Sequence, residues 1–187
     1  VFNITKQVND MNRIKFLRRE PYSRSFGFDR GLPIDRYYIE KFLNNNKSYI
    51  KGDVIEIADN FYTNKFGLEV SKSLIMHVEP PEKSDNVIIA NLETGEGITD
   101  ELADCFIITQ TLLCIFDLKS AIENAMKLLK KGGTLLVTVP GITQISRYDM
   151  DRWGHFWSFT DLSVRKLFEK NVEPGKIYIE TYGNVKT

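Results

Sequence analysis

The 187-residue chain has little of several features that mark other protein classes. It carries no net charge, because 25 Lys and Arg residues balance 25 Asp and Glu residues, and nucleic-acid binding needs a positive surface. No apolar run approaches the ~20 residues that cross a bilayer, and the first ten residues lack a signal-peptide pattern. We therefore expect a cytoplasmic protein with no membrane span and no nucleic-acid partner.

Cysteine and histidine are also scarce. The two cysteines, Cys105 and Cys114, lie in apolar stretches, which predicts reduced, buried thiols. There is no Cys-x-x-Cys and no paired histidine, so we expect no metal site. A phosphate-binding Gly-x-x-x-x-Gly-Lys-Ser/Thr loop and a Gly-x-Gly-x-x-Gly run are absent, which disfavours P-loop and nicotinamide-dependent enzymes.

The length suits a single domain over residues 1–187, and 42% hydrophobic residues are enough for a core. We divide it into an N-terminal helical lid, 1–48, and a Rossmann-like core, 49–187. Residues 1–41 carry a charge of +4, from nine basic and five acidic side chains. This charge indicates either a solvated helical face or arginines, such as Arg30 and Arg36, that meet an anionic group. The chain begins without Met, which we interpret as a piece of a longer or processed protein.

The hydrophobic pattern predicts alternating strands and helices. Helices are expected over 6–20, from Pro33 onward, from the N-cap Asp117 to Gly132-Gly133, and after the N-cap Thr160. The expected strands cover 51–58, 73–78, 86–91, 104–110, 134–140 and 176–183. Several are continuous apolar runs, which is typical of strands that are buried on both faces. The fold class is therefore α/β, with a doubly wound, mostly parallel sheet whose ligands bind at the carboxyl ends of the strands.

The segment from Asp104 to Gly141 resembles the fourth strand, helix and fifth strand of class I S-adenosylmethionine (SAM)-dependent methyltransferases. Its Leu129-Lys130-Lys131-Gly132-Gly133 run has Lys where Pro is usual in that family. Val54-Ile55-Glu56-Ile57 resembles the first strand, which carries the SAM-binding loop. The stretches 31–43, 138–160 and 182–185 resemble a narrower group of methyltransferase-like domains among bacterial glycan-biosynthesis proteins.

The resemblance implies SAM as cofactor and assigns its contacts to strand ends. The expected cofactor-binding residues are Glu56, Ala58, Asn60, Glu79, Asn91, Leu92, Thr109, Gln110 and Arg36. Ala58 and Asn60 stand where the family has glycines, so the loop departs from the usual cradle, and Asn tolerates positive φ better than most residues. Glu79 would bind the ribose and Asn91 the adenine amino group through its amide oxygen. Solvated or purely structural roles for Glu79 and Thr109 remain open.

The catalytic candidates follow the fifth strand. His155 is one of two histidines and is expected to act as a general base, with Asp149 or Asp151 orienting its imidazole. The alternative is that Trp153, Phe156, Trp157 and Phe159 form a packed corner that His155 caps. The same aromatic rings would also suit stacking against a sugar.

These features predict a SAM-dependent methyltransferase that O-methylates a saccharide or anionic precursor in surface-glycan biosynthesis. The alternative functions are a non-catalytic methyltransferase-like domain that supports a glycan-assembly partner, and a nucleotide-sugar binder. A homodimer or a glycosyltransferase partner is also expected to be possible. The family resemblance implies seven strands, and we expect the final one to be removed, or supplied by the N-terminal segment or another subunit.

Overall fold

The computed structural model describes residues 23, 28–82 and 85–183. The chain divides into two compact units, residues 1–37 and 38–187, and the boundary falls inside helix α2 (Ile34–Asn45). The N-terminal unit contributes the 3₁₀ turn η1 (Phe28–Arg30) and the start of α2, where we expected a helix after Pro33. The helix expected over 6–20 lies outside the described residues.

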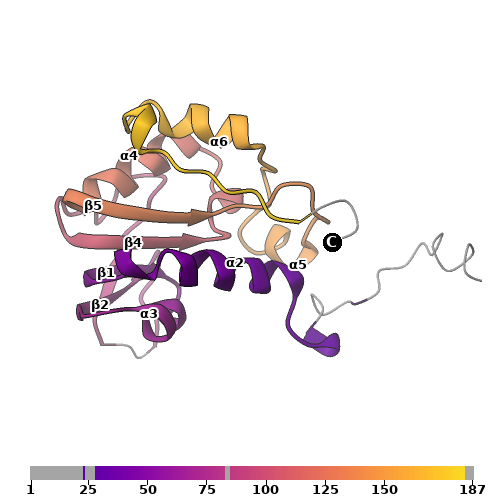
Figure 1. Ribbon diagram of the computed structural model, residues 1–187, viewed down its shortest axis with the longest axis horizontal. Coiled ribbons are helices and arrows are strands. Elements are labelled where there is room, and N and C mark those ends of the chain that lie inside the picture. The colour runs from indigo at the N-terminus through magenta and orange to yellow at the C-terminus, as the bar shows by residue number, and fades with distance from the viewer. Residues whose placement is uncertain (1–22, 24–27, 83–84, 184–187) are drawn as a thin grey trace, which may run out of the picture. The chain divides into compact units, whose positions relative to one another are not determined.

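The second unit is built on a five-stranded sheet (Figure 1). Its strands are β1 (Gly52–Ile57), β2 (Val70–His77), β3 (Val87–Ile89), β4 (Ala103–Thr109) and β5 (Leu129–Thr138). The order is β3-β2-β1-β4-β5, and every neighbouring pair is parallel. The chain moves outward from β1 to β3 and then returns to place β4 on the other side of β1. The sheet therefore has a topological switch point between β1 and β4, and the predicted α/β fold class is confirmed.

Helices cover both faces of this sheet (Figure 1). Besides α2, the helices of the second unit are α3 (Phe61–Phe66), α4 (Leu118–Leu128), α5 (Arg147–Met150) and α6 (Asp161–Phe168), with 3₁₀ turns η2 (Lys47–Tyr49), η3 (Leu112–Cys114) and η4 (Pro174–Lys176). Alternate residues of the central strands enter two separate cores. Val54 and Ile107 pack with side chains of α2 and α3, whereas Ile55, Phe106 and Ile108 pack with α4 and α6. The continuous apolar runs of the sequence are explained by this burial on both sides.

Two helix starts follow the local sequence signals. The Asp117 carboxylate accepts the Ser120 N–H at 3.1 Å, which caps α4 as expected. Thr160 and Ser163 form a reciprocal capping box at the start of α6. Both caps confirm the sequence prediction. Each joins residues only three positions apart, so a local sequence pattern is enough to predict it.

The Gly132-Gly133 pair does not end α4, which corrects our expectation. The helix ends at Leu128, and β5 begins at the next residue. Ala103 of β4 pairs with Leu129 of β5, and Cys105 of β4 pairs with Thr134 of β5. Between these two pairs β4 advances two residues while β5 advances five. The glycines lie within this bulge, where Gly132 has a φ of +81°.

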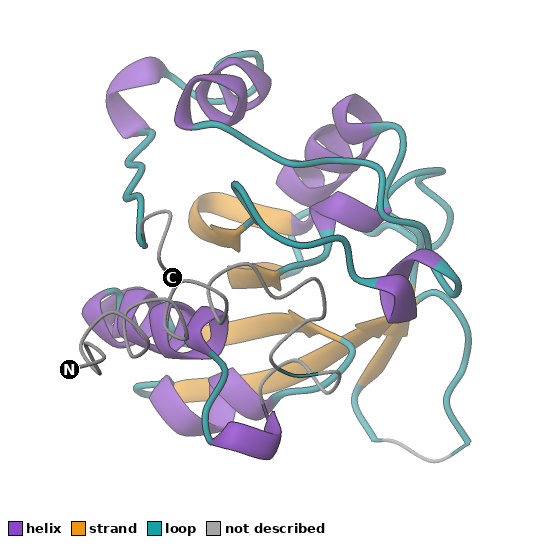
Figure 2. Ribbon diagram, turned by 90° about the vertical axis from the view of Figure 1, so that its right-hand side faces the viewer, coloured by secondary structure: helices purple, strands orange, loops and turns teal. Residues whose placement is uncertain are grey.

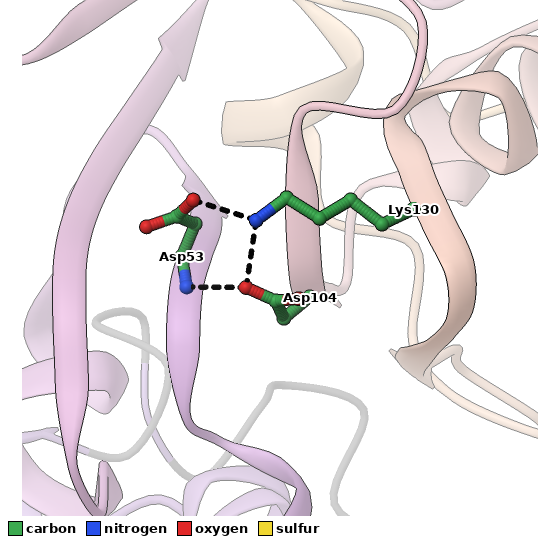
Figure 3. Close-up of polar contacts among 3 residues, drawn as sticks. All are labelled: Asp53, Asp104 and Lys130. Atoms are coloured by element: carbon green, nitrogen blue, oxygen red, sulfur yellow. Dashed lines mark hydrogen bonds and ion pairs between the residues drawn. The ribbon is translucent and has the colours of Figure 1, made fainter.

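The bulge presents Lys130 to the amino ends of the two central strands (Figure 3). Its Nζ lies 2.6 Å from Asp53 Oδ2 and 2.9 Å from Asp104 Oδ2. Asp104 Oδ2 also accepts the backbone N–H of Asp53 at 2.8 Å. The Asp53 N–H and the Lys130 ammonium hold the pKa of Asp104 below its ordinary value. This cluster ties three strands together at the edge opposite to the one where ligands are expected.

The sixth strand expected over 176–183 is not formed. Residues 177–183 run as irregular chain after η4, although Ile177 and Ile179 are half-buried and alternate with the exposed Tyr178 and Glu180. The alternating pattern is therefore real, but a strand also needs a hydrogen-bonded neighbour. No backbone hydrogen bond in the described chain joins this segment to β5. Ile177 packs against the α4–α6 core, and the Tyr182 ring instead stacks on Tyr38 of α2 with centroids 5.4 Å apart.

Among the described residues, no helix has both the length and the apolar character that crossing a membrane requires.

Candidate functional site

The carboxyl ends of the strands gather most of the residues that the sequence singled out. The arrowheads of β4 and β5 mark this edge in Figure 1, and Figure 2 views the sheet from the same edge. In open parallel sheets, ligands bind outside this edge at the switch point, which here lies between β1 and β4.

Two residues at the switch point have strained backbones. Ala58 directly follows β1 with a φ of +71°, and Gln110 directly follows β4 with a φ of +48°. Left-handed backbone costs a residue with a side chain roughly 1–2 kcal/mol. Each turn is pinned to the neighbouring strand, because the Ala58 N–H donates to Met76 O at 3.1 Å and the Gln110 N–H to Thr138 O at 2.9 Å. Such strain gathers at functional sites, where the surrounding structure enforces it.

Glu56 is buried and holds the start of helix α3. Its carboxylate accepts the Tyr62 N–H at 3.0 Å, the Thr63 N–H at 2.7 Å and the Thr63 hydroxyl at 2.7 Å. Burial raises the pKa of Glu56, and these hydrogen bonds oppose the rise. The Glu56 side chain therefore fixes the position of α3 and of the turn before it, a role that the sequence did not indicate.

The turn after β1 continues through Asp59 and Asn60 into α3. Asp59 Oδ1 accepts the Phe61 N–H at 2.9 Å. Asn60 has a φ of −121°, so its tolerance of positive φ is not used, and the left-handed residue of this turn is Ala58. Asn60 instead donates from its amide to Ser73 Oγ at 3.3 Å, which links the turn to β2.

A hollow of about 390 Å³ lies at the ends of β2 and β3. Its lining combines apolar side chains with two polar ones and comprises Val78, Ile89, Ala90, Asn91, Glu96 and Gly97. The sequence reasoning named only Asn91 among these. The sequence signal for the others was the turn-rich Thr-Gly-Glu-Gly run after β3. In the structure, a side chain at Gly97 would collide with the Ile89 carbonyl oxygen, so the hollow requires glycine there. Glu79, one residue after Val78, is exposed.

Asn91 and Leu92 shape the loop after β3. Asn91 Oδ1 accepts the N–H groups of Glu93 at 2.8 Å and Thr94 at 3.3 Å. Both lone pairs of this oxygen therefore serve the loop, and the acceptor role that we expected of it is already taken within the chain. Leu92 is a core residue with 4% exposure. Glu93 extends the network to α4, because its carboxylate accepts the Asp117 N–H at 2.9 Å.

The end of β4 carries Thr109 and Gln110, both half-buried. The Thr109 carbonyl accepts the Thr111 hydroxyl at 3.0 Å. The Gln110 amide lies 3.5 Å from Thr138 Oγ1 at the end of β5. These contacts order the strand ends on one side of the switch point.

The three catalytic candidates lie in the segment around α5. His155 Nδ1 accepts the Ser146 N–H at 3.3 Å, so in the neutral ring the proton resides on Nε2. Asp149 is half-buried in α5, and Asp151 is exposed just after it. Neither aspartate has a hydrogen bond to His155 among those that the structure describes, and the predicted orienting contact is not present.

The same segment packs on η3, which follows β4. The Phe156 N–H donates to Leu113 O at 2.8 Å, and the Trp157 Nε1–H donates to Ile115 O at 2.9 Å. Phe116 contacts both rings, with centroids 5.5 Å from Phe156 and 5.9 Å from Trp157. The expected corner is therefore formed only in part: Phe156 and Trp157 pack on Phe116, whereas Trp153 contacts Tyr148 and Phe159 lies in the main core.

Both thiols are free, and burial deactivates them. Burial raises the pKa of Cys105 to about 12 and that of Cys114 to about 11, where Asp149 adds to the rise. Within the described parts of the chain, no group of three or more His, Cys, Asp or Glu side chains is arranged to hold a metal ion. Arg36 belongs to the N-terminal unit, and its expected contact with an anionic group stays a prediction.

Comparison with solved structures shows what this fold is similar to. A S-adenosylmethionine-dependent methyltransferase from Mesorhizobium loti superposes with a TM-score of 0.51 at 11% identity, over 73% of this chain and 79% of that one. The N-methyltransferase NodS from Bradyrhizobium japonicum WM9, solved with S-adenosyl-L-homocysteine (SAH), gives 0.52 at 20% identity, over 83% and 84%. No protein-family model and no curated protein matches the sequence. The similarity establishes a Rossmann-like α/β fold that is shared with SAM-dependent methyltransferases.

Proposed function

We propose that the protein is a SAM-dependent methyltransferase whose cofactor lies over the carboxyl ends of β1 to β4. The observation that carries this proposal is the pair of left-handed residues, Ala58 and Gln110, on the two strands that flank the switch point. Glu69, Asn86 and Glu101 also have a positive φ, but Ala58 and Gln110 are the two that directly follow the strands flanking the switch point.

The residues at this edge suit a nucleoside with an attached amino acid. The hollow at β2 and β3 offers the apolar walls Val78 and Ile89 for a purine, and the exposed Glu79 carboxylate suits two ribose hydroxyls. The turn at Ala58 brings backbone toward the ligand side with only one methyl group in place of a glycine hydrogen. When bound, SAM supplies a sulfonium methyl group, and the chain has to hold the acceptor in line with it.

The acceptor is, in this proposal, a saccharide or an anionic precursor in surface-glycan biosynthesis, methylated on oxygen. The exposed aromatic rings of the 147–157 segment support it, as does the sequence resemblance of 138–160. Arg36 is the candidate to pair with an anionic group. Asp149 and Asp151 are the other base candidates, while His155 would act as a base through Nε2 only in the tautomer that carries its proton on Nδ1.

A second candidate function is a non-catalytic methyltransferase-like domain. It is favoured by Ala58 in place of the expected glycine and by the Asn91 oxygen, which already accepts two backbone N–H groups. This arrangement would keep the fold while weakening cofactor binding.

Titration calorimetry with SAH separates the two functions. We expect binding to the wild-type protein and a roughly 10-fold or greater loss in Glu79→Ala, since a hydrogen bond to a charged group contributes about 1.5–3 kcal/mol. Glu82→Ala is the matched control, because Glu82 is an exposed glutamate three residues further along the same loop. An absence of binding at millimolar SAH would favour the non-catalytic domain, and equal losses in both variants would contradict the ribose contact.

A further inference from the structure

Three aromatic rings form an exposed surface beyond the end of β4. We call Phe116, Phe156 and Trp157 the aromatic platform. Their exposed fractions are 64%, 50% and 36%, which is high for rings that contact one another. Phe116 lies six residues after the strained Gln110, in the segment that follows β4.

Two hydrogen bonds attach the platform to the segment that follows β4. The Phe156 N–H and the Trp157 indole N–H donate to carbonyls of Leu113 and Ile115, at 2.8 and 2.9 Å. The Phe156 ring stands edge-on to Phe116 at 77°, and the Trp157 ring is tilted by 31° to it. Because the indole N–H is already bound, what Trp157 presents to solvent is apolar ring surface.

A neighbouring aromatic pair differs in this respect. Tyr148 and Trp153 contact edge to face at 5.9 Å, but the Arg152 guanidinium lies 3.5 Å from the centre of the Tyr148 ring. That ring face is occupied within the chain by a cation. The Tyr148 ring is therefore a weaker candidate for stacking than the platform rings.

The size and surroundings of the platform indicate the class of its ligand. An aromatic side chain buries about 150–250 Å² when fully covered, so three half-exposed rings offer roughly 200–400 Å², below the ~800 Å² per partner of a stable protein interface. That area matches one or two ring-sized groups. A carboxylate lies next to the platform along the chain, because the exposed Asp117 directly follows Phe116. An apolar face beside a hydroxyl-accepting carboxylate suits a pyranose, which has an apolar C–H face and a rim of hydroxyls.

We propose that the aromatic platform is a saccharide-binding subsite on which the C–H face of a pyranose stacks against Phe116 and Trp157. Its assignment as the methyl-acceptor subsite rests on the proposed function, whereas saccharide binding itself does not.

Saturation-transfer difference NMR tests this subsite with the methyl β-pyranosides of glucose, galactose and mannose as probes. We expect saturation of at least one probe, strongest at the ring protons of a single face. Phe116→Ala and Trp157→Ala should each weaken the binding about twofold to tenfold, the range expected for the loss of one aromatic contact. Trp157→Phe keeps a stacking ring and should keep most of the signal, even if the lost indole hydrogen bond lowers stability.

Two variants serve as matched controls. Tyr178→Ala removes an aromatic ring that is 87% exposed elsewhere on the chain, and Trp153→Phe keeps the neighbouring pair aromatic. Trp153 and Trp157 are the two tryptophans of the chain, so tryptophan fluorescence follows the same titrations. Both controls should bind the probes as the wild-type protein does.

Several outcomes would overturn the subsite. They are no saturation of any pyranoside, equal signals in the platform variants and the controls, or stronger binding of indole than of every pyranoside. A wild-type dimer in sedimentation velocity that Trp157→Ala dissociates would instead assign the platform to a second copy of the chain. Calorimetry with SAH on the same variants keeps the questions apart: SAH binding without saccharide binding removes the subsite, and saccharide binding without SAH binding removes the proposed methyl transfer.

Discussion

Ala58 and Gln110 adopt the same left-handed backbone conformation on the adjacent strands β1 and β4, each at the first residue after its strand. Neither residue is glycine, so both positions carry a conformational cost that a glycine would largely avoid. The two turns frame the switch point, and they provide the most direct test of how much strain the site holds.

Replacing Ala58 with glycine should stabilise the protein. The Ala58 side chain is exposed, so its removal loses little packing, while the strain at φ +71° is relieved. We expect Ala58→Gly to raise the free energy of unfolding by about 1 kcal/mol in urea denaturation. Ala90→Gly is the control, because Ala90 is buried and has no positive φ. It should lower stability, and a similar loss in Ala58→Gly would contradict the strain.

Glu56 should affect both the start of α3 and the pH dependence of stability. In Glu56→Gln the amide oxygen can serve Thr63, but the amide nitrogen then faces the Tyr62 N–H and leaves a buried donor unpaired. We expect a loss of about 1–3 kcal/mol at neutral pH. Glu123→Gln, on an exposed part of α4, should change stability little.

The sign of the Glu56 pH effect is opposite to that of most carboxylates. Burial raises its pKa above the ordinary 4.5, so the folded state binds the proton more tightly than the unfolded state does. As the pH falls from above the raised pKa to 4.5, this group should add to the free energy of unfolding. Urea denaturation over this pH range should show the wild-type protein gaining stability relative to Glu56→Gln. A parallel course for the two proteins would contradict the raised pKa.

Lys130 should stabilise the amino edge of the sheet above pH 4 and not in strong acid. Lys130→Met leaves the carboxylates of Asp53 and Asp104 without their shared cation. The lowered pKa of Asp104 stabilises the fold above its ordinary value of 3.8, and this contribution is lost as the pH falls through the lowered value. The stability difference between wild type and Lys130→Met should therefore shrink in acid denaturation curves.

The neighbouring Lys131 provides the control for this cluster. Lys131→Met removes the same charge from an exposed position one residue away. If both variants lose equal stability, the effect is one of net charge and the Lys130 contacts contribute nothing specific. High salt should weaken the Lys130 effect, since the three side chains are about one third exposed.

His155 should carry its neutral-ring proton on Nε2. The Ser146 N–H donates to Nδ1, which requires a lone pair on that nitrogen. Long-range ¹H–¹⁵N correlation spectra report the tautomer directly, and His77→Gln identifies which of the two histidines gives each signal. A proton on Nδ1 would instead leave Nε2 able to accept a proton and would restore the general-base role.

Local sequence was sufficient wherever a structure depends on near neighbours. Asp117 and Thr160 cap their helices through residues three positions away, so their patterns carried the full information. The apolar runs of β1 and β4 likewise predicted burial on both faces, because a strand covered on two sides has no polar face to show. These two kinds of signal were enough to predict the fold class.

The tertiary structure alone decided how individual site residues are used. Glu56 and Asn91 stand at strand ends as the sequence predicts, but their oxygens accept backbone N–H groups of the turns that follow. The segment 176–183 has strand periodicity and yet forms no strand, since pairing depends on distant chain. A hydrophobic pattern along the chain specifies which face of a helix or strand is apolar. The hydrogen-bond partners and the backbone strain of a single residue depend on which segments meet in space.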